Sequence, residues 1–121
     1  MTIESLNFLQ NLFRSNGINY ELEEWTGETI YPYFVGEYQE SPTTQENGMQ
    51  ESLFILNGFM RGKRLALEQA KAIIERIANT RAILPSGNGI AISYETSAMI
   101  PTYDEELKRI QINLNIKEWK V

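Results

Sequence analysis

Hydrophobic positions change from a continuous run to a helical spacing within residues 50–81, the most strongly patterned stretch of the chain. Residues 53–56 (LFIL) contain no polar side chain, which predicts a strand covered on both faces. Gly58 is expected to interrupt this strand, because glycine in a strand marks a bulge or a close backbone approach. Beyond the turn at Arg61-Gly62, apolar residues follow the spacing of an amphipathic helix: Leu67, Ala70, Ile74 and Ile77.

The first residues predict a second amphipathic helix, at about 2–15. Thr2 is a suitable N-cap and Glu4 follows in the first turn, where the helix dipole favours a carboxylate. Asn16-Gly17 supplies the C-terminal stop. The broad apolar face leaves two interpretations open, packing against the sheet or sharing with a neighbouring subunit; it comprises Ile3, Leu6, Leu9 and Phe13.

Two strands are expected next, at 20–25 and 29–40, and the second is dense in aromatic and β-branched residues. Pro32 lacks a backbone donor, so this strand is expected at a sheet edge or a bulge. An aromatic edge invites a partner, although the same side chains also suit a surface where only their hydroxyls are wet. The tyrosines concerned are Tyr31, Tyr33 and Tyr38.

Polar and turn-forming residues separate the remaining elements. Residues 40–49 read as an exposed, mobile loop, because Ser-Pro and Asn-Gly break regular structure. Residues 84–89 (LPSGNG) form a turn-rich linker before a strand at 90–94, and 96–103 are expected to be irregular. Pro101 requires the residue before it to be extended.

The last strand has the clearest alternation, with Ile110, Ile112, Leu114 and Ile116 separated by polar residues. One face is therefore core and the other is polar, and Gln111, Asn113 and Asn115 lie on the polar face. If the register holds, Trp119 and Val121 also fall on that face and form a candidate subunit contact. The alternative is a bulge near Lys117-Glu118.

These elements predict one α+β domain spanning residues 1–121, in the order α-β-β-β-α-β-β. The sheet is expected to be largely antiparallel, with both helices packed on one face. A chain of 121 residues agrees with a single domain.

Composition narrows the chemistry that the chain can perform. It contains no cysteine and no histidine, which removes thiolate and imidazole nucleophiles, bases and metal ligands. We therefore expect no enzyme, no metal site, no cofactor and no small-molecule substrate. The net charge of −5 argues against specific nucleic-acid binding, because such a surface repels phosphates. No apolar run approaches the roughly 20 residues that span a bilayer, and the first residues have no basic signal region, which predicts a cytoplasmic protein.

Three polar clusters are weak candidates for a metal-binding or phosphate-binding site. Glu21, Glu23 and Glu24 do not share one strand face, so they suit solvated edge charge better than a metal. Residues 104–106 (DEE) read as a polar turn opening the last strand. Residues 86–89 (SGNG) lack the P-loop lysine and the Rossmann spacing.

Several phrases of the sequence occur in a familiar layout. A helix precedes a tyrosine-rich strand ending in YFVGEYQE, then come NGMQES, FILNGFMRG running into a helix, and a closing PTYDEELKRIQINLNIKEWKV. This layout resembles tail terminator (tail-to-head joining or tail-completion) proteins of long-tailed bacteriophages and their prophage relatives. The resemblance covers nearly the whole chain and rests on layout and phrases such as ELKRIQINL and IKEW.

The resemblance implies a structural virion protein, present in the host cytoplasm during assembly and then at the head–tail junction. It implies a ring, usually a hexamer, whose partners are itself and other tail or head-connector proteins. Candidate contact residues are Trp25, Tyr31, Tyr33, Tyr38, Arg61 and Trp119, and the polar row Gln111, Asn113 and Asn115 is a candidate channel lining. The alternatives are a small binding or regulatory module using the open sheet face, and an enzyme built on glutamates and tyrosines.

Overall fold

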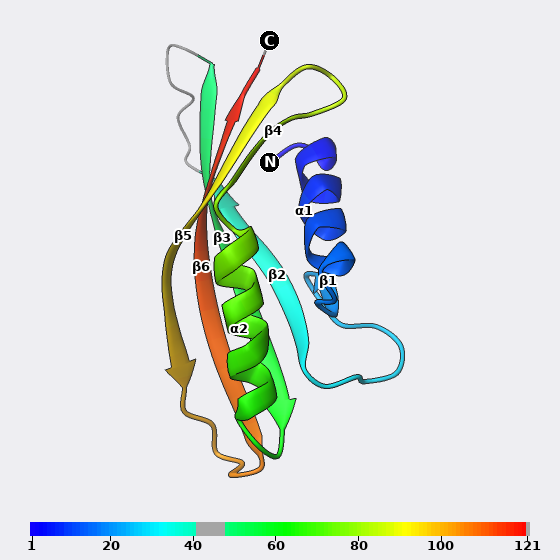
Figure 1. Ribbon diagram of the computed structural model, residues 1–121, viewed down its shortest axis with the longest axis vertical. Coiled ribbons are helices and arrows are strands. Elements are labelled where there is room, and N and C mark those ends of the chain that lie inside the picture. Colours follow the sequence, from blue (N-terminus) through cyan, green and yellow to red (C-terminus); the bar gives the residue numbers. More distant parts are fainter. Residues whose placement is uncertain (41–47, 121) are drawn as a thin grey trace.

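The computed structural model describes residues 1–40 and 48–120. Two helices, α1 (Ile3–Ser15) and α2 (Leu65–Ile77), lie on the same side of one sheet (Figure 1). The sheet has six strands in the spatial order β1–β2–β3–β6–β5–β4, and only the β1–β2 pair is parallel. The strands are β1 (Tyr20–Leu22), β2 (Tyr33–Glu40), β3 (Met49–Arg61), β4 (Thr80–Ile83), β5 (Gly89–Ile100) and β6 (Leu107–Trp119). The α+β class and the largely antiparallel sheet are thus confirmed.

Strands β3 and β6 form the centre of the sheet and pair without interruption from Met49↔Trp119 to Arg61↔Leu107. The alternation predicted for β6 is confirmed, because its apolar residues are at most 1% exposed: Ile110, Ile112, Leu114 and Ile116. No bulge occurs near Lys117-Glu118, so Trp119 lies on the face opposite the helices.

Gly58 does not interrupt β3, contrary to the sequence prediction. It pairs with Phe34 on one side and Ile110 on the other. A Cβ atom at Gly58 would lie 2.3 Å from the Phe34 ring, so the glycine makes room for a side chain rather than for a backbone. The expectation that both faces of 53–56 are covered was also wrong, because Leu53 and Ile55 are only half-buried.

Helix α1 begins and ends where the sequence predicts. The Thr2 hydroxyl accepts a hydrogen bond from the Ser5 amide at 3.1 Å, and Gly17 follows the helix with a φ of +79°. Leu9 and Phe13 are fully buried, which supports packing of this helix against the sheet. The N-cap is also held from outside, because the carboxylate of Glu118, which is 4% exposed, accepts hydrogen bonds from the Thr2 amide and hydroxyl.

Helix α2 buries Leu67, Ala70 and Ile74 in the core formed with β3 and β6. On its outer face the Lys71 ammonium lies 3.3 Å from the Glu75 carboxylate, one turn further along. Each side chain therefore falls on the helix face that the sequence spacing predicts.

Three local predictions differ from the structure. Strand β2 is covered by β1 at residues 34–36, and Pro32 precedes its first residue, so the proline does not mark an edge within the strand. Strand β4 was not predicted and adds a strand to the element order. Strand β5 continues through 96–100, which were expected to be irregular, after a register shift at Glu95. Of the predicted loop 40–49, residues 41–47 lie outside the described residues.

Candidate functional site

One face of the sheet has no helix on it among residues 1–40 and 48–120, and we call it the open face. The strand register places on it the odd-numbered residues of β2, β3 and β6. Half-buried apolar side chains alternate there with polar ones; the apolar set is Val35, Leu53, Ile55 and Phe59. The open face is therefore more apolar than the polar side predicted from the last strand alone.

The predicted polar row lies on the open face, and its side chains are joined by hydrogen bonds. The Gln111 amide donates to the Asn113 oxygen at 3.3 Å, and the Asn113 amide donates to the Thr96 hydroxyl at 3.0 Å. The Asn115 amide donates to the Glu51 carboxylate at 2.7 Å. The first of these contacts is within β6 and the other two join β6 to β5 and to β3, so the row is held in place from both neighbouring strands.

An aromatic row crosses the open face near the end of β3. The Trp25 and Tyr33 ring centroids are 5.1 Å apart, Tyr31 and Tyr33 are 5.6 Å apart, and Tyr33 stacks on Phe59 at 5.1 Å. Burial, with a smaller effect from Tyr31, raises the pKa of Tyr33. The row joins β2, β3 and the loop after β1 into one surface.

Arg109 of β6 continues this row. Its guanidinium carbon lies 5.8 Å from the centre of the Phe59 ring, and its Nη2 donates to the Asn57 side-chain oxygen at 2.8 Å. No carboxylate in the described part of the chain forms an ion pair with it. Its Nε is the one buried side-chain nitrogen or oxygen of the described residues that has no hydrogen-bond partner.

Arg61, the predicted contact residue at the end of β3, forms an ion pair with a carboxylate, whereas Arg109 does not within the described residues. A hydrogen bond with Tyr31 and the charge of Asp104, whose carboxylate is 3.4 Å away, raise the pKa of Arg61. Both Arg61 and Asp104 are about half exposed, so this pair is screened by water and contributes little to stability.

A concavity of about 460 Å³ opens beside the aromatic row. It is lined by three aromatic rings, one arginine and three carboxylates. The lining residues are Glu23, Glu24, Trp25, Tyr33, Val35, Glu37, Asn57, Phe59 and Arg109. The site therefore combines ring faces with an excess of negative charge.

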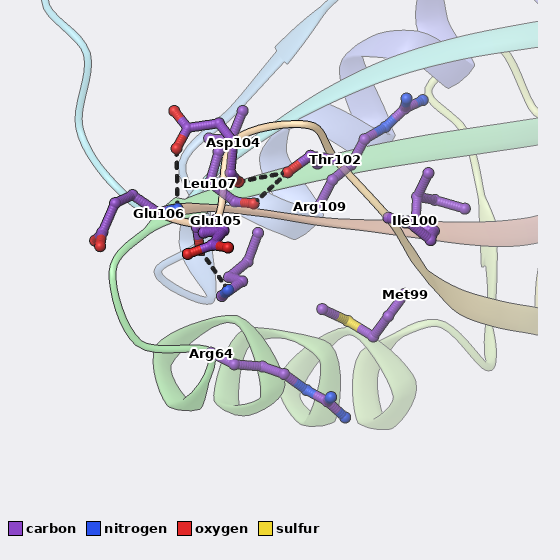
Figure 2. Close-up of a pocket in the computed structure, with 11 residues that line it drawn as sticks. Arg64, Met99, Ile100, Thr102, Asp104, Glu105, Glu106, Leu107 and Arg109 are labelled. Carbon is purple, nitrogen blue, oxygen red and sulfur yellow. Dashed lines mark hydrogen bonds between the residues drawn. The ribbon is translucent and has the colours of Figure 1, made fainter.

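A second hollow, of about 690 Å³, lies against the hairpin between β5 and β6 (Figure 2). The hairpin is fixed internally, since the Thr102 hydroxyl lies 2.7 Å from the backbone oxygens of both Asp104 and Leu107. Figure 2 shows the Arg109 guanidinium pointing away from the hairpin carboxylates. Within the described residues, no three or more carboxylates converge as a metal site.

The structure brings together four of the six predicted contact residues: Trp25, Tyr31, Tyr33 and Arg61. Tyr38 lies instead on the helix-covered side, opposite Phe54, and is half-buried against the core. Trp119 lies on the open face at its other end, paired with Met49 and Gly89.

Sequence reasoning missed Phe59 and Arg109 as members of this surface. Both are adjacent only through the pairing of β3 with β6, which residue spacing along either strand does not give. The alternation along β6 places Arg109, an odd-numbered residue, on the polar face of that strand. This is the one feature of the sequence that indicates Arg109 as a member of the surface.

The weaker candidate clusters are explained by local structure. The Glu21 carboxylate accepts a hydrogen bond from the Thr26 amide at 2.6 Å and so closes its own loop. The amide and hydroxyl of Ser86 both donate to the carboxylate of Glu4, each at 2.7 Å. The glycine-rich loop thus binds a carboxylate of α1.

Comparison with models of known protein families finds no match, and comparison with curated proteins finds none either. No helix in the part of the chain that the structure describes is long and apolar enough to cross a membrane. The open face and the phrases quoted from the sequence are therefore the features that bear on function.

Proposed function

We propose that this chain is a structural virion protein that caps the tail tube of a long-tailed bacteriophage and joins it to the head connector. Its subunits assemble from the host cytoplasm into a ring of six. It acts without catalysis or a cofactor, and its partners are further copies of itself and other tail or connector proteins.

The observation that carries this proposal is the open face with its aromatic row. Apolar side chains gathered on a surface mark a contact with another protein. Ile30 and Tyr31, beside the row, are 53% and 37% exposed, which adds to the apolar surface available. A ring requires two different contact surfaces on each subunit, because each copy meets one neighbour on either side.

A free sheet edge supplies a second contact surface. Strand β4 pairs with β5 only as far as Ile92, so in the described chain no strand covers the outer side of residues 96–100. An uncovered edge presents unpaired backbone groups that a strand of a neighbour can bind. The β2 and β3 residues of the aromatic row lie on one side of β6 and this edge on the other, so the two surfaces are separate.

The polar row suits a channel that DNA passes through without being held. The amides of Gln111, Asn113 and Asn115 carry no positive charge, and the net charge of the chain is −5. Phosphate groups are held mainly by Lys and Arg, so a lining of this kind lets DNA slide.

The proposal is tested by adding purified protein to tail tubes assembled from a purified tail-tube protein of a long-tailed bacteriophage. Tubes capped by the protein stop growing, so electron microscopy should show a narrower and shorter length distribution, with density at one end. Tyr31→Ala, which changes the aromatic row, should weaken capping. Ile83→Ala, which changes an exposed residue of β4, is the matched control and should not. Absence of binding to both tube and connector proteins at high concentration would refute the proposal.

The concavity favours one alternative, a monomeric or dimeric binding module that uses the open face. A binding module of this kind needs a hollow on the sheet, and a hollow of about 460 Å³ is lined by residues of the open face. Light scattering on the protein with and without tail tubes separates the two functions. A monomer that remains a monomer in the presence of tubes favours the module.

A further inference from the structure

We propose that the concavity beside Trp25 and Tyr33 binds an arginine side chain presented by a partner protein. The proposal concerns which side chain the open face recognises. It does not depend on the chain being a tail protein, because a binding module would use the same hollow.

The first argument is a contact that the chain already makes with its own arginine. Arg109 lies over Phe59, and Phe59 stacks on Tyr33, which contacts Trp25. The described residues place no cation over Trp25 or Tyr33. Aromatic faces attract cations through the ring quadrupole, and Trp and Tyr do so at least as well as Phe. In the part of the chain that the structure describes, Trp25 contacts only one other ring of the row and is half-buried, so it offers ring surface for a second cation.

The second argument is charge. Glu23, Glu24 and Glu37 line the hollow, and all three are exposed. None of their carboxylates has a hydrogen bond or ion pair within the residues that the structure describes. Three carboxylates oppose the single guanidinium of Arg109, which lies over Phe59 and donates through Nη2 to Asn57, while its Nε has no hydrogen-bond partner in the described chain. A cationic group is therefore favoured over an anionic one.

The third argument selects arginine over lysine. A guanidinium is planar, so it stacks on an aromatic ring while its edge donates two hydrogen bonds to a carboxylate. The hollow is lined by both kinds of partner, the rings of Trp25 and Tyr33 and the carboxylates of three glutamates. Its volume of about 460 Å³ lies within the range of pockets that take small ligands, so a side chain with its flanking backbone fits.

The test uses N-acetyl-arginine amide as the probe and two-dimensional NMR of the labelled protein as the readout. The Trp25 indole N–H, which donates to the Glu28 oxygen at 3.0 Å, reports on the hollow. The Trp119 indole, at the other end of the open face, is the internal reference. We expect Trp25 to shift on titration while Trp119 does not.

Two matched controls separate charge from shape. N-acetyl-citrulline amide has the shape of the arginine probe without its charge and should bind at least about fivefold more weakly. Glu37→Gln should weaken arginine binding by about threefold or more, whereas Glu95→Gln, at an exposed site on β5, should leave it unchanged. Both substitutions are at exposed positions, and circular dichroism checks that each variant is folded.

Three results would overturn the proposal. Equal binding of the citrulline and arginine probes would show that charge plays no part. Tighter binding of N-acetyl-glutamate amide would make Arg109 the anchor of an anion site instead. Equal effects of Glu37→Gln and Glu95→Gln would place the binding elsewhere. Each of these results leaves the tube-capping assay unaffected, so the two proposals fail separately.

Discussion

Replacing Gly58 by alanine tests the packing at the centre of the sheet. A Cβ atom at this position would lie 2.3 Å from Cε1 of Phe34 and 2.8 Å from two further atoms of the same ring. The Phe34 side chain is 1% exposed, so its ring has no free space to move into. The substitution therefore overpacks a region that is already close-packed.

The expected cost follows from two opposing effects. Overpacking of a buried site costs about 1–3 kcal/mol. Removing a glycine also restricts the unfolded chain, which stabilises the folded state by about 0.4–1 kcal/mol. We expect Gly58→Ala to lower the free energy of unfolding by about 1–2 kcal/mol, and the melting temperature by about 4–8 °C.

The matched control is Gly89→Ala. Gly89 also lies in a strand with an ordinary φ, but its Cβ would be 3.5 Å from the Trp119 ring, an ordinary contact. This variant should match the wild type or gain up to about 1 kcal/mol. Urea unfolding followed by circular dichroism measures both, because that signal does not depend on either tryptophan.

A double-mutant cycle identifies the ring as the cause. In a Phe34→Leu background the clashing ring atoms are absent, so Gly58→Ala should cost at least about 1 kcal/mol less than in the wild type. If Gly58→Ala is as stable as Gly89→Ala, or if its cost is the same in both backgrounds, the explanation of Gly58 by the Phe34 ring is wrong.

Three further changes test other contacts. Thr2→Ala removes the N-cap of α1 and the hydroxyl bonded to buried Glu118, and should lower the unfolding free energy by about 1–2 kcal/mol in a urea titration. Burial raises the pKa of Tyr20 far above its ordinary value of 10.0, so stability should be unaffected below that pH and fall as pH rises above it, when the unfolded chain ionises first. Tyr20→Phe should flatten this alkaline decline, and an unchanged slope would contradict the assignment. Lys71→Ala breaks an exposed ion pair with Glu75 and should cost at most about 0.5 kcal/mol, with the remaining effect removed by salt.

The parts of the fold that the sequence predicts are those with a repeating pattern. The alternation around Ile112 and the spacing around Ile74 located β6 and α2, because burial selects one face of each element. Thr2 and Gly17 located the ends of α1 through their local backbone requirements. These signals are complete within one element and need no knowledge of its neighbours.

The errors occur where a neighbouring element decides the conformation. Gly58 reads as an interruption until Phe34 is placed opposite it on the next strand. Strand β4 has only four residues directly after a helix, and its pairing with β5 stabilises it. The site shows the same limit, because Phe59 and Arg109 meet only through the β3–β6 register.

The unbroken pairing of β3 with β6 also restricts how the gene can change length. Thirteen residues on each strand keep one register, so inserting a single residue within either would turn the following inward side chains outward. Strand β5 already accommodates one extra residue at Glu95. Length variants among descendants of this chain should therefore gain or lose residues in pairs within the two central strands, and singly in β5.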